Sequence, residues 1–510
     1  MCVLAGHVIV FSICVRCWLH RVTTLILISH LIIIEGVHFM ISKINWKAFI
    51  LPILLGVILW LLTPLKPTDI SPVAWHLFAI FIATIVACIT KPLPMMATTL
   101  IGVTIAMLAG IFKMNEVTAG FGNSTSWMVA MCMFMAAGFI KSGLGKRIAY
   151  LFVKLFGKRT LGLAYALSAV DTVLAIGIPS NNARVNGIMY PIIDNLSREM
   201  GSDPKNGTER KLGSFLVFNE YEINNASSGL FLTGLAGNLI AIGLAKTQGI
   251  TISWFQWFAA ASVPGILSLL VIPFVLYKIY PPEIKETPNA NAWANDRLQE
   301  LGKMSVSEII MLATFVMAII LWLVGTKFGI DATAVSFIAV GVLLVTGVLT
   351  TKDLLKESFA WNILVWLSVI MLMSQKLMTL GFFPWFSKTL GGLLNGMNWI
   401  LVLVILFLAY FYLHYLFPSV ATQISALYAG FLSIAIGAGV PHILAALMLA
   451  FCGSIYLSTT PYSAGPAALL SGTGYVTNKD WWKLSAVIGV IFNIILLGGG
   501  LLWTKIIGLW

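Results

Sequence analysis

Two short stretches of the sequence combine proline with hydroxyl and amide side chains inside strongly apolar surroundings. The first reads IPSNNARVNGIMYP and supplies Ser180, Asn181 and Asn182; the second reads FPSVATQISALYA and supplies Ser419 and Thr422. Hydroxyl and amide groups donate hydrogen bonds, and the first turn of a helix adds free backbone N–H groups and a positive dipole end. These groups bind carboxylates in proteins. Each stretch is therefore a candidate site for an anion.

Two further stretches, LTGLAGN and TTPYSAGP, interrupt hydrophobic segments with small and polar residues. Their polar side chains are Thr233, Asn238, Thr459 and Thr460. If all four interruptions meet, four helix ends surround one point and suit a small molecule with two or more negative charges. The alternative is four ordinary N-caps in a packed helical bundle. Their symmetric order in the two halves of the chain favours a binding site.

Three charged residues near these stretches have two interpretations each. Arg184 lies one helical turn after the first serine, on the same face, and a charge at that depth is costly and usually functional. It either neutralises a carboxylate of the bound anion or pairs with Asp171 or Asp194 as a structural lock. Glu220 and Glu222, at the start of the next broken helix, are either a solvated cytoplasmic helix end or part of a proton relay.

The composition places the chain in a membrane. Its 510 residues are 59% hydrophobic and only 10% charged, which leaves too little charge to cover a soluble surface. Several apolar runs approach or exceed the roughly 18 residues expected of a helix that spans a bilayer. Examples are 49–65, 73–89, 311–324, 400–411 and 484–502. The sequence therefore predicts an all-α polytopic membrane protein.

The net charge of +12 is unevenly distributed along the chain. Lysine and arginine gather at 141–159 and 198–211, and the positive-inside rule makes both loops cytoplasmic. The six cysteines and seven histidines show no metal-ligand spacing. We expect no cofactor, no dedicated metal site and no nucleic-acid partner, with a residual cation site near Ser180 and Asn181 left open.

Residues 1–39 differ in composition from the rest of the chain. They contain four of the seven histidines and three of the six cysteines. This break suggests an extension upstream of a natural start at Met40. The alternative is a genuine additional helix at Val22–Phe39.

The chain repeats itself on the two sides of a charged linker at 281–304. Ser180 and Ser419 are 239 residues apart, and Thr233 and Thr460 are 227 residues apart. Each match is weak alone, but a constant order at near-constant spacing indicates an internal duplication.

The two units span about 73–280 and 305–507. One unpaired helix at 49–65 precedes them. The stretch around each Pro-Ser pair starts and ends on one side of the membrane, which predicts a re-entrant hairpin with its tip at 179–182 or 418–421. Each unit then crosses five times, so the second unit is inverted relative to the first. The predicted fold has about eleven transmembrane helices plus two re-entrant hairpins whose tips meet near the midplane.

From Met40 onward the sequence resembles the divalent anion:sodium symporter (DASS, INDY-like) family. It is most similar to the branch of 2-oxoglutarate/malate translocators and citrate or tartrate/succinate antiporters. PSNNARVNG resembles that branch's PSNTARAGG signature, HYLFPSVATQISALY its HYxFASxTAHxSAM signature, and TPYSAGPAALLSGTGY its HYGTGPAPxxFGSGY stretch. The resemblance implies a homodimer that works as an elevator. It implies a fixed scaffold at 49–160 and 305–395 and a moving transport domain at 161–280 and 396–507.

The resemblance also implies how the tips bind ions. Sodium-coupled members carry Ser-Asn-Thr at both tips, and each Asn helps to hold a sodium ion. The second tip here reads Ser-Val-Ala; sodium prefers oxygen ligands, and the Val420 side chain has none. The substrate-binding residues that we predict are Ser180, Asn181, Asn182, Arg184, Thr233, Ser419, Val420, Ala421, Thr422, Thr460 and Pro461.

We therefore expect a multi-pass transporter of the bacterial cell membrane that exchanges C4 and C5 dicarboxylates without sodium. The substrate class is that of 2-oxoglutarate, malate, succinate and fumarate. The alternative is a sodium-coupled di- or tricarboxylate symporter. An anion channel or a membrane-embedded enzyme fits less well, because inverted symmetry serves alternating access and the chain has neither HExxH nor G-x-S-x-G.

Overall fold

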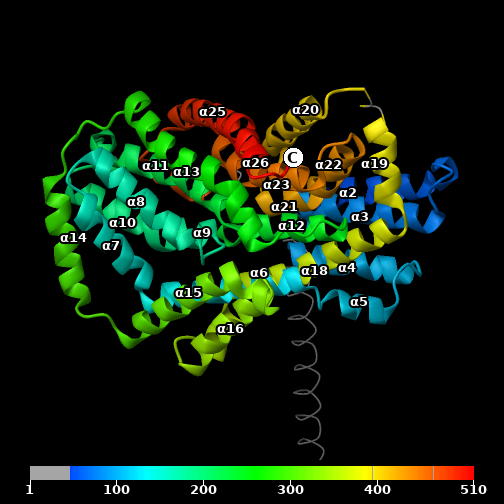
Figure 1. The fold of residues 1–510 in the computed structure, drawn as a ribbon, viewed down its shortest axis with the longest axis horizontal. Helices are drawn as coiled ribbons and strands as arrows, with labels where there is room; N and C mark the ends of the chain where they lie inside the picture. The colour runs from blue at the N-terminus through cyan, green and yellow to red at the C-terminus, as the bar shows by residue number, and fades with distance from the viewer. Residues whose placement is uncertain (1–45, 393, 395, 418, 463) are drawn as a thin grey trace, which may run out of the picture.

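The computed structural model describes residues 46–392, 394, 396–417, 419–462 and 464–510. Apart from one isolated β-bridge, the regular elements of this part of the chain are all helical (Figure 1). Nine of the described helices are long and apolar enough to cross a membrane, which agrees with an all-α polytopic membrane protein. The predicted extension at 1–39 and Pro418 of the second predicted tip lie outside the described residues.

The helices are distributed on both sides of the charged linker that separates the two predicted units. Before the first unit comes α2 (Trp46–Leu61), and between the units lies α14 (Pro288–Leu301). The first unit contains α3 (Pro72–Thr90), α4 (Met95–Leu108), α5 (Met114–Gly120), α6 (Ser124–Ser142), α7 (Leu144–Phe156), α8 (Thr160–Ala175), α9 (Asn181–Arg184), α10 (Tyr190–Glu199), α11 (Gly213–Leu230), α12 (Ala236–Thr247) and α13 (Trp254–Ile279). The second contains α15 (Val306–Val324), α16 (Ala332–Val345), α17 (Thr351–Lys356), α18 (Ser358–Thr379), α19 (Phe382–Gly392), α20 (Trp399–Tyr412), α21 (Val420–Gln423), α22 (Ala429–Gly437), α23 (His442–Ile455), α24 (Gly465–Ser471), α25 (Asn478–Ile494) and α26 (Leu501–Ile506).

Polar caps define where several of the long apolar helices begin. The side chains of Ser71, Asn123, Ser253 and Ser305 accept hydrogen bonds from backbone N–H groups in the first turns of α3, α6, α13 and α15. Gly143 ends α6 with a φ of 80°, a left-handed conformation that favours glycine. These signals fix the helix ends and leave the apolar runs between them to span the bilayer.

The segments of the two predicted hairpins share an unusual backbone detail. In the first, α9 passes through a π-helical turn, Val185–Met189, into α10; in the second, α21 passes through the π-helical turn Ile424–Tyr428 into α22. The two turns start 239 residues apart, the same spacing as the two tip serines. Because π turns are rare, their recurrence at equivalent places shows that the backbone repeats as well as the sequence.

Corresponding helices of the two units pack against each other in opposite directions. Lys141, in the last turn of α6, pairs with Asp353 of α17 at 2.7 Å, and α17 directly precedes α18. Lys376, near the end of α18, pairs with Glu116 of α5 at 2.7 Å, and α5 directly precedes α6. Each of the two helices therefore ends beside the start of the other, so α6 and α18 are antiparallel.

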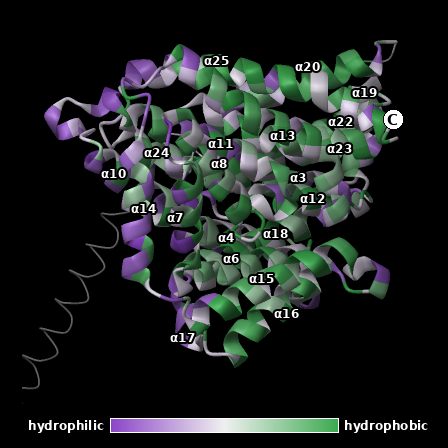
Figure 2. Cartoon of the chain, turned by 60° about the vertical axis from the view of Figure 1, so that its left-hand side comes forward, coloured by the Kyte–Doolittle hydropathy of each residue, from purple (hydrophilic) through white to green (hydrophobic). Residues whose placement is uncertain are grey.

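The linker contains a helix, α14, that the sequence analysis did not predict. Just before α14, the backbone N–H of Thr287 donates to the carbonyl of Lys158 at 2.9 Å, and its hydroxyl donates to the carbonyl of Gly157 at 2.7 Å. Tyr150 of α7 meets Trp293 of α14 edge to face, with ring centroids 5.5 Å apart. The helix lies at the edge of the molecule and carries hydrophilic residues (Figure 2). The linker is thus attached along α7.

A buried ion pair fixes the end of the linker. Arg147 of α7 donates two hydrogen bonds to the Glu308 carboxylate of α15. Its Nε donates to Oε1 at 2.6 Å, and its Nη2 donates to Oε2 at 3.1 Å. Arg147 Nη1 also donates to the carbonyl of Gly302 at 3.0 Å. This bidentate geometry is strong and specific. It ties the first unit to the start of the second.

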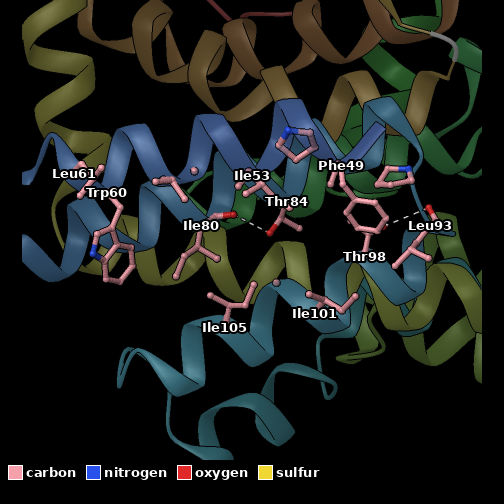
Figure 3. A pocket seen from close by; sticks show the side chains of 17 residues that line it. Phe49, Ile53, Trp60, Leu61, Ile80, Thr84, Leu93, Thr98, Ile101 and Ile105 are labelled. Carbon is pink, nitrogen blue, oxygen red and sulfur yellow. Dashed lines mark hydrogen bonds between the residues drawn. The ribbon is translucent and has the colours of Figure 1, made fainter. Parts of the chain in front are cut away.

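An apolar pocket of about 330 Å³ lies among α2, α3 and α4 (Figure 3). Two close approaches hold these helices together: Gly56 lies against Ala83, and Gly102 lies against the side chain of Thr84. Thr84 Oγ1 donates to the carbonyl of Ile80 at 2.8 Å, so its hydroxyl is satisfied within its own helix. The pocket therefore offers hydrocarbon surface and no free charge.

The exposed pair at Lys141 and Asp353 gives a test of the packing between α6 and α18. Lys141 holds the pKa of the Asp353 carboxyl well below its usual value. The contribution of the pair to stability is therefore present above about pH 4 and is lost as the pH falls through the folded pKa. We expect Asp353→Asn to melt slightly earlier than the wild type at neutral pH and to lack this acid-dependent loss, as measured by thermal unfolding. Lys141→Gln removes the other charge and leaves the hydrogen bonds from Thr350 to Asp353 in place; it should lower the melting temperature at neutral pH by a similar amount. An Asn variant with wild-type pH dependence would contradict the assignment.

Candidate functional site

The first tip joins α8 to α9. It comprises the loop 176–180 and the first two residues of α9, and it carries the predicted polar side chains. Ser180 caps α9, because its Oγ accepts from the backbone N–H of Ala183 at 3.1 Å. Asn181 Oδ1 accepts from the N–H of Asn182 at 2.9 Å, and Asn182 Oδ1 accepts from Asn186 Nδ2 at 2.9 Å. These bonds use the amide oxygens and leave the Nδ2 groups of Asn181 and Asn182 as donors. Asn182 is exposed and Ser180 and Asn181 are partly exposed, so the donors face open space.

Hydrogen bonds attach this tip to the break between α11 and α12, residues 231–235. Thr233 Oγ1 donates to the carbonyl of Ile176 at 2.5 Å, and the N–H of Ala236 donates to the carbonyl of Pro179 at 2.8 Å. Trp254 Nε1 donates to Thr233 Oγ1 at 3.2 Å. Thr233 is fully buried. Its hydroxyl therefore holds the tip against the break.

Asn238 satisfies the backbone of the same break. Its Nδ2 donates to the carbonyls of Ser228 at 2.7 Å and Phe231 at 3.0 Å. A helix that stops at membrane depth leaves carbonyls without intrahelical partners, and lipid cannot supply them. One amide side chain from the next helix therefore completes the end of α11.

Arg184 is fully buried and joins the tip, the break and two helices. Its Nε donates to Asp171 Oδ1 of α8 at 3.0 Å. Its Nη1 donates to the carbonyls of Ile178 in the tip at 2.7 Å and Gly234 in the break at 2.6 Å. Its Nη2 donates to Ser228 Oγ of α11 at 2.7 Å. Of the two predicted arrangements, the structure therefore has the one in which Arg184 forms a lock with Asp171.

Asp194, the other predicted partner of Arg184, belongs to a different contact. Its Oδ1 accepts from Arg198 Nε at 3.0 Å and from the hydroxyl of Tyr475 at 2.9 Å. Arg198 also pairs with Asp203 at 2.5 Å. This cluster connects the C-terminal half of α10 to the segment before α25.

The second tip is held by a neutral counterpart of this lock. Tyr410 and Gln423 stand 239 residues after Asp171 and Arg184. Gln423 Nε2 donates to the carbonyl of Tyr410 at 2.8 Å, and its Oε1 lies 2.5 Å from His414 Nδ1. All three side chains are buried. An amide and an imidazole therefore do here what the ion pair does at the first tip.

Each hairpin contacts the broken helix of the opposite unit. Gly465, the first residue of α24, lies so close to the Asn182 amide that a Cβ would overlap it. Gly237, in the first turn of α12, lies against Val420 and Ile424, and a Cβ there would sit 3.0 Å from Val420 Cγ1. The start of α9 therefore meets the start of α24, and the start of α21 meets the start of α12. Four helix starts come together in two crossed pairs.

The remaining predicted residues divide by exposure. Ser419, Ala421 and Pro461 are partly exposed, whereas Val420, Thr422 and Thr460 are buried. Thr422 Oγ1 lies 4.0 Å from Met95 Sδ at the start of α4, and the carbonyl of Thr460 accepts from Tyr221 at 3.3 Å. The partly exposed members surround the crossed helix starts, and the buried ones support them.

Glu220 and Glu222 are buried inside the protein and do not lie at a solvated helix end. Both lie inside α11, are 0% exposed, and have carboxyl oxygens without a hydrogen-bond partner among the described residues. The interpretation as a solvated helix end is therefore wrong. The signal in the sequence was the run FNEYEINNASS, in which polar residues occur on every side of the helix and cannot all face water.

Removing the Arg184 guanidinium will leave Asp171 buried without its counter-charge. Loss of one partner of a buried ion pair costs about 3–5 kcal/mol, so we expect Arg184→Ala to melt far below the wild type. The double variant Arg184→Gln with Asp171→Asn has no buried charge to leave unpaired, and it should recover most of the stability. Thermal unfolding with malate binding measured in parallel checks both. An Arg184→Ala protein that melts normally but no longer binds malate would identify Arg184 as a direct anion ligand.

The sequence matches known proteins over nearly its whole length. It is 42% identical over 470 residues to the putative malate transporter YflS of Bacillus subtilis, covering 92% of this chain and 98% of that protein. It is 42% identical to the chloroplastic dicarboxylate transporter 1 of Spinacia oleracea, covering 91% and 82%. It is 34% identical to the citrate/succinate antiporter of Escherichia coli, covering 89% and 96%.

Two solved structures have a similar fold at low sequence identity. The YdaH transporter of Alcanivorax borkumensis matches with a TM-score of 0.55 at 12% identity, over 77% of this chain and 87% of that chain. MtrF of Neisseria gonorrhoeae matches with a TM-score of 0.54 at 12% identity, over 78% and 84%. The family model described as the sodium:sulfate symporter transmembrane region covers residues 42–510. The chain therefore belongs to this family, the divalent anion:sodium symporters, which are multi-pass membrane transporters.

Proposed function

We propose that this protein exchanges C4 and C5 dicarboxylates, of the 2-oxoglutarate, malate, succinate and fumarate class, across the cell membrane. The observation that carries this proposal is the crossed contact of four helix starts, α9 with α24 and α21 with α12. Their positive dipole ends, together with the side-chain amides of Asn181 and Asn182, suit two carboxylates on one small molecule. The names of the malate, dicarboxylate and citrate/succinate relatives support the same substrate class.

The proposed topology has eleven crossings, two re-entrant hairpins and an inverted repeat. It is supported by the antiparallel packing of α6 and α18 and by the equivalent π turns of the two hairpins. The hydrogen bonds from the first break to the first tip also support a tip that lies level with the middle of a broken crossing helix. Such irregular backbone at membrane depth is typical of transporter binding sites.

The proposed motion is that of an elevator in a homodimer. The transport domain comprises 161–280 and 396–507, and the scaffold comprises 49–160 and 305–395. In both whole-molecule views α8, α11, α13 and α25 lie on one side and α4, α6, α15 and α18 on the other (Figures 1 and 2). The first tip is hydrogen-bonded to its own break, whereas the scaffold side chains nearest to its Gly177 are the apolar Phe315 and Met135. Apolar contacts of this kind permit sliding more readily than hydrogen bonds do.

The lock at the first tip supports exchange without sodium. Backbone carbonyls at a tip and a helix break are suitable ligands for a sodium ion. Here the guanidinium of Arg184 occupies the carbonyls of Ile178 and Gly234, and Val420 adds no oxygen at the second tip. Unlike a bound ion, the arginine cannot leave when the carrier is empty. Asp171 neutralises Arg184, so the positive potential of the empty site comes from the dipole ends of the helix starts. Only a bound dianion offsets this potential, so only the loaded carrier crosses readily.

A sodium-coupled symporter is the second candidate function. The family description names sodium:sulfate symport, and backbone carbonyls elsewhere at the tips remain suitable cation ligands. An enzyme or a channel draws no support from the comparisons, because the relatives and the family are named as transporters or symporters.

Transport into liposomes separates the two candidates. We expect purified protein to take up labelled malate only when the liposomes contain unlabelled dicarboxylate, and to do so equally well in sodium, potassium or choline. The physical reason is that an empty positive site does not cross the bilayer. Concentrative uptake into empty liposomes driven by an inward sodium gradient would overturn the exchange mechanism in favour of symport.

The amides at the first tip should contribute directly to binding. Loss of one charge-assisted hydrogen bond costs about 1.5–3 kcal/mol, or roughly a ten- to hundredfold loss of affinity. We therefore expect Asn181→Ala and Asn182→Ala each to weaken malate binding by this factor with little change in melting temperature. Asn295→Ala, which removes an amide on α14 bonded to Lys154 at 2.7 Å, is the control and should bind malate normally. Normal binding in both tip variants would place the site elsewhere.

A further inference from the structure

A second buried carboxyl group lies beside the lock formed by Arg184 and Asp171. Glu220 of α11 is 0% exposed, and both of its carboxyl oxygens lack a hydrogen-bond partner among the described residues. It lies one helical turn before Asn224, whose Nδ2 donates to Asp171 Oδ1 at 3.1 Å. Residues one turn apart share a helix face, so Glu220 faces the lock. Because buried polar groups are rarely left unpaired, its position requires a physical explanation.

The lock has no bonding capacity left for Glu220. Each nitrogen of the Arg184 guanidinium already donates hydrogen bonds: Nε to Asp171, Nη1 to two carbonyls and Nη2 to Ser228. Asp171 accepts from Arg184, Asn224 and Ser227. The pair is therefore neutral and saturated. An ionised Glu220 would add a lone negative charge to an apolar interior, which is strongly unfavourable.

We propose that Glu220 is a proton-binding site linked to the first tip through Arg184; this inference rests on the proposed exchange function. With its proton, Glu220 is neutral and Arg184 stays on the carbonyls of Ile178 and Gly234. When the O–H bond breaks and the proton passes to water, the Glu220 carboxylate becomes an acceptor for Arg184. It then competes with both carbonyls, so loss of the proton loosens the tip that forms one side of the dicarboxylate site.

The charged surroundings of Glu220 are few. Asp171 of α8 and Arg184 of α9 are the charged groups that act on it. Glu222 lies two residues further along α11, which turns it to the opposite side of the helix. The other titratable groups on α11 and on the elements packed against it are Tyr221 of α11, Tyr165 of α8, Tyr190, Asp194, Arg198 and Glu199 of α10, Glu209, Arg210 and Lys211 before α11, Tyr277 and Lys278 of α13, His442 and Cys452 of α23, Tyr456 after α23, Tyr475 before α25, and Lys479, Asp480 and Lys483 of α25. Asp194 and Arg198 already pair with each other at 3.0 Å.

The affinity of the reconstituted protein for malate, measured as a function of pH, tests the proposal. One proton linked to binding changes the apparent affinity by up to about tenfold per pH unit. We expect the wild type to bind malate more weakly as the pH rises, over a range in which malate itself stays a dianion. Glu220→Gln cannot lose a proton and should keep the tight binding at every pH. Glu222→Gln is the matched control, equally buried but without charged neighbours acting on it, and should retain the wild-type slope.

Infrared spectroscopy of the protein without substrate provides a second readout that does not depend on transport. We expect a protonated-carboxyl C=O band that weakens as the pH rises and that loses this pH-dependent part in Glu220→Gln. A wild-type pH slope retained in Glu220→Gln, or a band independent of pH, would overturn the proton site. Absence of malate exchange at every pH, with the infrared result as expected, would instead contradict the proposed function and leave the proton site standing.

Discussion

Backbone hydrogen bonding at membrane depth is the constraint on which this structure depends. Two tips and two helix breaks leave N–H and C=O groups without intrahelical partners, and hydrocarbon supplies none. In the first unit one arginine meets much of this need, because Arg184 binds a carbonyl of the tip and a carbonyl of the break. Asp171 balances the charge that this requires. The helix starts keep their positive dipole ends, and the side-chain amides of Asn181 and Asn182 add donors at the start of α9; these are the groups that an anion needs.

The two units meet the same need with different chemistry. The second unit uses Gln423 and His414 where the first uses Arg184 and Asp171. An amide lock carries no ion pair, so it does not require a counter-charge. The first tip therefore has a buried ion pair where the second has a neutral contact, and the carboxyl group of Glu220 faces that ion pair. An internal duplication has thus become chemically asymmetric while its backbone geometry, down to the π turns, has stayed the same.

The sequence predicted the parts of this structure that depend on local pattern and spacing. The apolar runs were sufficient for the helical fold, and the constant spacing between Ser180 and Ser419 recurs in the spacing of the two π turns. Spacing alone did not decide between Asp171 and Asp194 as the partner of Arg184. Asp171 lies beyond a non-helical tip, and its direction depends on the path of that tip. Only the folded backbone determines this path.

Two other features were missed for related reasons. Glu220 and Glu222 were interpreted as a solvated cytoplasmic helix end. The polar run around them is instead buried by α8, α13 and α23, which belong to other parts of the chain. The helix α14 was read as a polar linker. Its start at Thr287-Pro288 is a recognisable signal, but its stability comes from contacts with α7 that the linker sequence does not contain.

An experimental structure with bound malate tests the central claim most directly. The account predicts density for the dianion between the crossed helix starts. One carboxylate should lie at the start of α9, beside the Asn182 amide. The other carboxylate should be contacted by α24, α12 or α21. Arg184 should remain on Asp171 and the carbonyls of Ile178 and Gly234. Malate bound away from the tips, for example in the cavity lined by Lys246, Trp254 and Trp322, would contradict the claim that the crossed helix starts form the substrate site.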